Sequence, residues 1–263
     1  MQSKVIDFSA YSSLKIGVPL EVFVIESPQD LQEALSKNLR IIGKANNLLV
    51  SPNAQNLAVL GKNFAYLTEQ DNLIEIGGAY SSGRIFSYFK SHNLNGLEFL
   101  NALPGSLGGL IKMNAGMKSY EIKNILHSVN INGQWQSIES ISMNYRHSGI
   151  SGIILAARFY KKVGFDMAIW EECVALRKSH PHEPSCGSCF KNPKGDFAGR
   201  LLESVGLKGF CINDSALSEK HANFLINKGK ATFDDALSLI ALAKKRVFEA
   251  NGIDLECEVQ ILH

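Results

Sequence analysis

The stretch "GLEFLNALPGSLGGLIKMNAG", residues 96–116, decides the fold. It reads as a loop, a glycine turn and a short helix. Gly105, Gly108 and Gly109 let backbone N–H groups approach an anion, and Ser106 is placed to cap the helix that follows. A helix N-terminus with bare N–H groups suits a pyrophosphate. The stretch matches neither the Walker motif nor G-x-G-x-x-G, so a plain structural turn is the alternative reading.

A second small-residue loop, "IGKANNLLVS" (residues 42–51), lies between two expected strands. Two such loops in separate segments favour an extended dinucleotide over a mononucleotide. A strand over 20–27 and a helix capped by Ser27 precede this loop. A strand over 73–80 and a helix over 81–93 follow it. A hairpin that turns at Asn132-Gly133 and a strand over 152–162 come next.

Long helices are expected after residue 165, over 165–180, 197–209 and 232–252. Thr232 and Asp235 form a capping box at the start of the last helix, and Gly252 ends it. The segment 253–262 alternates apolar and polar residues strictly, which predicts a strand with Glu258 on its polar face. The pattern indicates an α+β chain in three consecutive parts, 1–57, 58–164 and 165–263.

The composition excludes several classes of function. The net charge of +2 is too small to indicate nucleic acid or an anionic membrane as a partner. The apolar runs are shorter than the roughly 20 residues that span a bilayer, and the N-terminus lacks the features of a signal peptide. We therefore expect a cytoplasmic protein without membrane insertion. The odd count of five cysteines argues against a disulfide framework.

The stretch "EPSCGSCFKNP" (residues 183–193) has two readings. Cys186 and Cys189 form a C-x-x-C, but Pro193 prevents the helix that a thioredoxin-like site needs, and no second ligand pair for zinc is evident. We interpret the cysteines as packing residues and expect no metal. The serine between them, Ser188, acts in proton transfer only if its neighbours tune it, and a serine in a turn is the alternative.

Two further residues are candidates for chemistry. Arg146 in "NYRHSG" (residues 144–149) offers a guanidinium that could clamp a carboxylate, although a surface ion pair is the commoner role of arginine. Glu258 is exposed by default on an alternating strand, and the functional alternative is a carboxyl group held against a site.

Taken in order along nearly the whole chain, these stretches resemble the UDP-N-acetylenolpyruvoylglucosamine reductases, the MurB family of peptidoglycan synthesis. The two loops and "YRHS" resemble three family motifs, and "PSCGSCFKNP" resembles the family's P-S-A-G-S-x-F-K-N-P. The other similar stretches are "SSLKIGVP", "AGRLLESVGLKG", "SEKHANFLIN" and "LECEVQI".

The resemblance implies an FAD-binding fold of the vanillyl-alcohol-oxidase type. FAD-binding subdomains are expected at 1–57 and 58–164, and a substrate-binding domain at 165–263. FAD would be bound noncovalently, and NADPH would reduce it. The reaction would convert the enolpyruvyl ether of UDP-N-acetylglucosamine to UDP-N-acetylmuramate.

The resemblance also implies roles for single residues. Ser188 would donate a proton to substrate carbon, while Arg146 and Glu258 would stabilise an enolate-like charge. Glu258 donates only if protonated, so we expect a raised pKa and less exposure than alternation suggests. Substrate contacts are implied for Asn192, Lys208 and His221. Cofactor contacts are implied for Gly17, Gly43, Asn46, Asn47, Leu48, Pro104, Gly105, Ser106, Gly108, Gly109, Asn114 and Gly116.

The chain departs from the family pattern at several points. Lys44, Ala45 and Asn46 replace a glycine- and serine-rich loop, and Val18 replaces a glycine. The segment between Arg146 and Ser188 is short, as in the type II subclass. Two alternatives remain: another flavoprotein of the same fold, which would not need "GSCFKNP", and a UDP-sugar binder without catalysis, which would not need flavin loops. We expect a monomer.

Overall fold

The computed structural model describes all 263 residues, which cluster into two compact units. The first comprises residues 1–4, 22–44 and 56–178, and the second comprises 5–21, 45–55 and 179–263. Helix α5 (Met167–Lys178) belongs to the first unit, although the sequence had placed the start of a third part at residue 165. The boundaries at 57 and 164 stay predictions.

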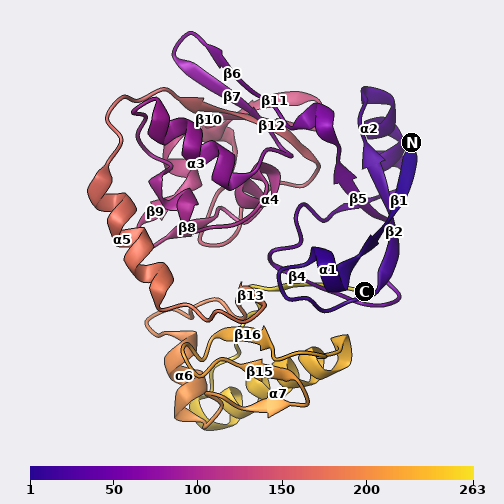
Figure 1. Cartoon of the computed structure of the whole chain (residues 1–263), viewed down its shortest axis with the longest axis vertical. Coiled ribbons are helices and arrows are strands. Elements are labelled where there is room, and N and C mark those ends of the chain that lie inside the picture. Colours follow the sequence, from indigo (N-terminus) through magenta and orange to yellow (C-terminus); the bar gives the residue numbers. More distant parts are fainter. The chain divides into compact units, whose positions relative to one another are not determined.

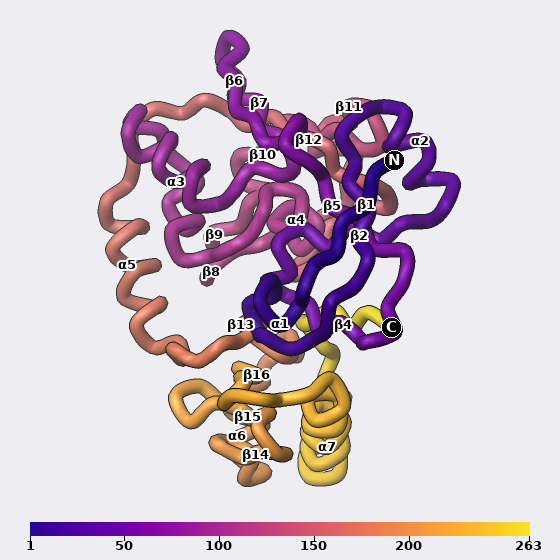
Figure 2. Tube along the Cα trace, turned by 45° about the vertical axis from the view of Figure 1, so that its right-hand side comes forward, coloured from indigo at the N-terminus to yellow at the C-terminus, as the bar shows by residue number.

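The first unit contains a small β-α-β layer, as predicted. Strands β2 (Pro19–Ile25) and β3 (Arg40–Ile41) both pair in parallel with β5 (Leu57–Leu60), and β1 (Gln2–Asp7) adds the outer strand beside β2 (Figure 2). Helix α2 (Pro28–Ser36) begins at a capping box in which Ser27 and Asp30 bond each other's backbone N–H. The helix packs its buried leucine and alanine onto this sheet.

A five-stranded antiparallel sheet forms the rest of the first unit. Its order is β11 (Gln134–Ser137), β10 (Leu126–Ile131), β12 (Ile154–Tyr160), β7 (Leu73–Gly77) and β6 (Leu67–Gln70). The predicted turn at Asn132-Gly133 is confirmed, and both residues have positive φ. Helices α3 (Ser82–Ser91) and α4 (Leu107–Lys112) and the hairpin of β8 (Gly116–Met117) with β9 (Tyr120–Glu121) complete this part around one apolar core.

The second unit is built on a four-stranded sheet ordered β13 (Ser185–Ser188), β16 (Phe224–Asn227), β15 (Ser215–Leu217) and β14 (Cys211–Ile212). Helices α6 (Ala198–Ser204) and α7 (Phe233–Asn251) lie beside these strands (Figure 1). The unit also holds α1 (Phe8–Tyr11) and a parallel pair of β4 (Leu48–Val50) with β17 (Gln260–Leu262). The predicted caps of α7 at Thr232 and Gly252 are confirmed.

The strand predicted over 253–262 is wrong over most of its length, because β17 covers only Gln260–Leu262. The chain bends just before β17. The N–H groups of Glu258 and Val259 both donate to the carbonyl oxygen of Cys189, at 2.8 and 3.3 Å. Two successive N–H groups that share one acceptor break the period-two pattern.

None of the helices is both long and apolar enough to cross a membrane.

Candidate active site

Ser188 lies at a β-bulge. In the pairing of β13 with β16, Ser185 stands opposite Ile226 and Ser188 opposite Phe224, so three steps on one strand match two on the other. The extra residue is accommodated at Gly187, whose φ of +80° favours glycine. Bulges bend a strand and re-aim the side chains beside them. The glycine before the serine therefore sets where Ser188 points.

The bulge also explains the C-x-x-C. Side chains of directly paired residues share a face of the sheet, so Ser185 and Ser188 lie with Ile226 and Phe224. Cys186 and Cys189 instead belong to the buried core that α6 and α7 also line. Both are free thiols. Burial raises the pKa of Cys186 to about 12 and that of Cys189 well above its usual range. The prediction that the cysteines are packing residues is confirmed.

Asn223 holds the segment after Ser188 in place, a role that the sequence did not suggest. Its buried side chain accepts from the N–H of Phe190 at 3.0 Å and donates to the carbonyl of Phe190 at 2.8 Å. Its own carbonyl accepts from the N–H of Cys189 at 2.7 Å. The Asn223 side chain thus pairs with the backbone of Phe190 as a neighbouring strand residue would, just before β16 begins. The only sequence feature that pointed to Asn223 was its position within "SEKHANFLIN", one of the stretches that resemble the family.

Glu258 is brought beside Ser188 by backbone contacts. Its N–H bonds the carbonyl of Cys189, the residue after Ser188. Its own carbonyl accepts from the Asn47 side chain at 2.9 Å, which links it to one of the predicted cofactor loops. Glu258 is partly buried, whereas its neighbour Glu256 is exposed. The expectation that Glu258 is less exposed than alternation suggests is therefore supported, while its raised pKa stays a prediction.

Arg146 belongs to the first unit and lies at the tip of a two-residue turn. Asn144 and His147 exchange backbone hydrogen bonds of 2.7 and 3.1 Å across it, and Arg146 has a left-handed φ of +53°. Its guanidinium donates to the carbonyl of Gly116 at 2.9 Å. The Asn114 side chain donates to the Asn144 carbonyl at 3.0 Å. Residues 113–116 therefore orient the Arg146 turn.

Two predicted cofactor loops meet at Gly43 and Ser106. A Cβ on Gly43 would lie 3.0 Å from the Ser106 hydroxyl, which is tighter than ordinary contact. The expectation of bare N–H groups at the start of α4 is wrong in part. The N–H groups of Leu107 and Gly108 donate to the carbonyls of Tyr80 and Gly78, both at 2.9 Å. Ser106 occupies the N-cap position of α4, but its side chain bonds no backbone N–H of the helix.

At two of the predicted cofactor positions, Gly17 and Gly108, close packing explains why the residue is glycine. A Cβ on Gly17 would lie 2.4 Å from the Cβ of Phe8. A Cβ on Gly108 would lie 3.3 Å from two carbonyl oxygens, those of Gly78 and Ile154. These glycines are needed for the fold whether or not they contact a ligand.

Buried acceptors in the two loops fit a flavin nucleotide as hydrogen-bond donor. The side-chain oxygens of Asn46 and Asn114 are buried and accept no hydrogen bond. A buried acceptor without a donor costs about 1–3 kcal/mol, so each indicates a missing partner. A flavin offers a ring N–H and ribityl hydroxyls as donors. Leu48 begins β4 and Asn47 precedes it. Gly109 lies within α4, Pro104 and Gly105 precede this helix, and Gly116 follows it.

The three predicted substrate residues all lie around α6. Lys208 pairs with Glu203 at 3.0 Å. His221 lies near this pair and is half-buried, and burial lowers its pKa. Asn192 lies at the start of α6, where its side-chain oxygen accepts from the N–H of Ala198 at 3.0 Å, and a Cβ on the next residue, Gly199, would lie 3.3 Å from the His221 ring. Its amide nitrogen therefore keeps its donors for a ligand.

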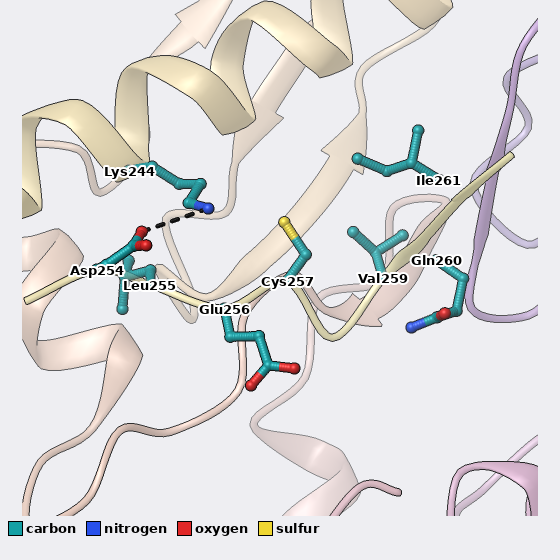
Figure 3. Close-up of a pocket in the computed structure, with 8 residues that line it drawn as sticks. All are labelled: Lys244, Asp254, Leu255, Glu256, Cys257, Val259, Gln260 and Ile261. Carbon is teal, nitrogen blue, oxygen red and sulfur yellow. Dashed lines mark ion pairs between the residues drawn. The ribbon is translucent and has the colours of Figure 1, made fainter. Parts of the chain in front are cut away.

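An open cavity of about 370 Å³ lies beside the bend that precedes β17 (Figure 3). Lys244 and Asp254 form an ion pair at 3.3 Å on its wall, and the sulfur of Cys257 points toward Lys244. Glu258 and Ser188 are not among the lining residues. This cavity therefore lies outside the candidate active site.

Comparisons with known proteins agree along the whole chain. Residues 179–262 match the model of the UDP-N-acetylenolpyruvoylglucosamine reductase C-terminal domain. Proteins named UDP-N-acetylenolpyruvoylglucosamine reductase from Helicobacter hepaticus and Helicobacter pylori are 75% and 53% identical, each with 100% of both chains covered. The crystal structure of such a reductase from Thermus caldophilus matches with a TM-score of 0.87 at 29% identity, over 100% of both chains. The predicted α+β fold is confirmed.

Proposed function

We infer the function from one premise: the chain belongs to the UDP-N-acetylenolpyruvoylglucosamine reductase family. It is an oxidoreductase of peptidoglycan precursor synthesis. It reduces the enolpyruvyl ether of UDP-N-acetylglucosamine to UDP-N-acetylmuramate, with FAD as cofactor and NADPH as reductant. When bound, FAD supplies the hydride that NADPH delivers.

The protein's part is to stabilise charge and to deliver a proton. Addition of hydride to the terminal carbon of the enolpyruvyl group pushes negative charge into its carboxylate. We propose that Arg146 stabilises this charge with a guanidinium that its turn and the Gly116 carbonyl hold in place before the reaction. A donor that is already oriented costs no reorganisation when the charge develops.

Glu258 is proposed as a second donor to the same charge. A carboxyl group donates a hydrogen bond only when protonated, so this role requires a pKa raised by its surroundings. The partial burial of Glu258 and the bend that turns it out of the alternating pattern support the proposal.

Ser188 is proposed as the proton donor, and one observation carries this assignment. The glycine bulge aims Ser188 from the sheet face opposite the buried cysteines, and the next residue accepts the N–H of Glu258. The hydrogen bond between Cys189 and Glu258 therefore holds the backbone of Glu258 next to the residue that follows Ser188. Proton donation to carbon then requires a substrate carbon within hydrogen-bond reach of the hydroxyl and neighbours that tune the hydroxyl as an acid.

The test separates the two half-reactions in Ser188→Ala. Flavin reduction by NADPH should proceed as in the wild type, because this half-reaction does not involve the proton that Ser188 would donate to the substrate. Anaerobic flavin reoxidation by the UDP-enolpyruvyl sugar should slow by about 10²- to 10⁴-fold, as expected when an acid is removed. Ser185→Ala, on the same strand and face, is the matched control. Normal reoxidation in Ser188→Ala would show that the serine is only a strand residue.

We further propose that the protein is cytoplasmic, because UDP-sugars and NADPH are both cytoplasmic, and that it acts as a monomer. Sedimentation should give a mass near 28.9 kDa for the chain. A dimer mass at micromolar concentration would contradict this.

A further inference from the structure

The side chain of Asn47 extends the pairing of β4 with β17 by one step. At the start of that parallel pair, the N–H of Gln260 donates to the carbonyl oxygen of Asn47 at 3.0 Å. In a regular parallel ladder the next hydrogen bond would run from the N–H of Asn47 to the carbonyl oxygen of Glu258. That carbonyl oxygen is bonded instead by the Asn47 side chain, whose Nδ2 lies 2.9 Å away. The amide side chain thus replaces a backbone donor at the point where the regular strand ends.

The backbone of Glu258 is therefore held from two directions. Its N–H donates to the carbonyl oxygen of Cys189, the residue after Ser188, at 2.8 Å. Its carbonyl oxygen accepts from Asn47, which belongs to the loop predicted to bind the cofactor. All these residues belong to the second unit. Because the direction of a side chain depends on the backbone that carries it, both contacts bear on where the Glu258 carboxyl group lies.

A second amide reaches the same carbonyl oxygen from within the same strand. The Nε2 of Gln260 lies 3.2 Å from the Glu258 carbonyl oxygen, two residues away. Gln260 is exposed, so water can take its place. Asn47 is partly buried and lies 211 residues from Glu258 along the chain. Of the two donors, only Asn47 fixes Glu258 relative to a distant part of the chain.

The residue before Asn47 has a different hydrogen-bonding pattern. The side-chain nitrogen of Asn46 donates to the Ser13 hydroxyl, whereas its side-chain oxygen is buried and accepts no hydrogen bond. This acceptor is the one that fits a flavin donor. The two neighbouring asparagines therefore serve different partners: Asn46 presents an acceptor to the cofactor, and Asn47 donates to Glu258.

We propose that Asn47 is a positioning residue that acts on substrate reduction through Glu258, an inference that rests on the proposed function. Its amide holds the backbone of Glu258 and so keeps the carboxyl group directed at the charge that develops on the substrate. The family resemblance implied a cofactor contact for Asn47, whereas its hydrogen bond is made to Glu258. Loss of this donor should leave flavin binding and flavin reduction intact and slow the transfer to substrate.

A double-mutant cycle on the FAD-saturated full-length protein tests this coupling. Asn47→Leu keeps the shape of the side chain without its donor. Anaerobic flavin reoxidation at saturating UDP-enolpyruvyl sugar should slow by about 10- to 100-fold, as expected for a misplaced catalytic group. In the Glu258→Ala background the same change should alter the rate by no more than about twofold, because the carboxyl group that Asn47 positions is gone. Gln260→Ala, which removes the local donor to the same carbonyl, is the control and should react as the wild type does.

Two further measurements separate positioning from a cofactor contact or a purely structural role. Titration of the apoprotein with FAD, followed by flavin fluorescence, should give the same dissociation constant for Asn47→Leu and the wild type. Asn47→Gln keeps an amide donor one methylene farther out, so it should restore part of the reoxidation rate. Asn47→Gln also takes the place of Asn47→Leu in the cycle if the leucine variant does not fold.

Either of two results would overturn the proposal. One is slowing by the same factor with and without the Glu258 carboxyl group, which would show that the two residues act independently. The other is weakened FAD binding together with wild-type reoxidation at saturating FAD, which would make Asn47 a cofactor contact. Failure of the proposed function is distinguishable, because Glu258→Ala alone would then reoxidise its flavin at the wild-type rate.

Discussion

Gly187 shows how a residue without a side chain sets the direction of a neighbour. Its φ of +80° is accessible to glycine at little cost, and a Cβ there would meet no atom within 4 Å. The requirement for glycine is therefore conformational and not steric. Other residues pay about 1–2 kcal/mol for a left-handed backbone, so a substitution would either strain the bulge or move Ser188.

Gly187→Ala should lower the melting temperature by about 2–8 °C and lower turnover more than that loss of stability explains. Gly195→Ala is the control, since Gly195 has φ +82° and equally open surroundings but lies in a turn away from β13. Melting curves and reoxidation rates would be compared for both. If the two variants lose activity equally, the bulge does not aim Ser188.

His221 makes a pH-dependent contribution to stability. Burial lowers the pKa of His221 below its ordinary value of 6.5, and its Nδ1 lies 3.3 Å from the N–H of Asn223 as an acceptor. The unfolded chain therefore binds this proton more readily than the folded one. The stabilisation is present above pH 6.5 and is lost as the pH falls from 6.5 through the lower, folded-state pKa.

Melting temperatures measured from pH 7.5 to 5 should consequently fall less steeply in His221→Gln than in the wild type. His92→Gln, which changes an exposed histidine in the first unit, should keep the wild-type slope. An unchanged slope in His221→Gln would mean that His221 protonates equally in both states.

At the scale of elements, β16 is tied at both ends by buried asparagines. Asn223 bonds the backbone of Phe190, and Asn227 bonds the Lys15 carbonyl and the N–H groups of Gly229 and Ala231. Both side chains satisfy backbone groups that have no strand partner. Only the first tie adjoins Ser188.

Asn223→Ala and Asn227→Ala should each cost about 1–3 kcal/mol or more, because each leaves buried backbone groups without partners. Only Asn223→Ala should also slow flavin reoxidation while leaving reduction by NADPH unchanged. Stopped-flow measurement of both half-reactions, beside melting curves, checks this. Equal reoxidation rates in the two variants would show that Asn223 supports the fold and does not position Ser188.

Elements with local signals could be predicted from sequence. The caps at Ser27, Thr232 and Gly252 and the turn at Asn132-Gly133 fix their elements through adjacent residues alone. The bulge at Gly187 and the bend at Glu258 could not be predicted, because each is imposed by a strand or carbonyl far along the chain. The roles predicted for Ser188, Glu258 and Arg146 rest on the family resemblance, whereas Asn223 has no periodic signal.

At the scale of the whole molecule, the second unit is assembled from three separate segments. Leu14, Ile16 and Leu49 are buried in its core, and β4 supplies the partner of β17. These residues are far in sequence from 179–263. The prediction divided the chain into three consecutive parts, so it could not place residues 5–21 and 45–55 in one unit with residues 179–263.

The fragment 179–263 should therefore not fold alone, although a family domain model matches almost all of it. It lacks three buried aliphatic side chains, each worth about 1.5–3 kcal/mol, against a total domain stability of about 5–15 kcal/mol. Dispersed amide signals in an NMR spectrum of the fragment would contradict this. The full chain, measured in the same buffer, is the control.

The orientation of β13 bears on inhibitor design. Cys186 and Cys189 lie on either side of the proposed proton donor, so they would be the first targets considered for an inhibitor that carries an electrophile. Both sulfurs face the apolar core, and burial keeps them protonated at physiological pH. An alkylating compound would meet Cys211 first, because it is the exposed thiol. Covalent ligands aimed at this site would have to react with the serine hydroxyl or with a lysine instead.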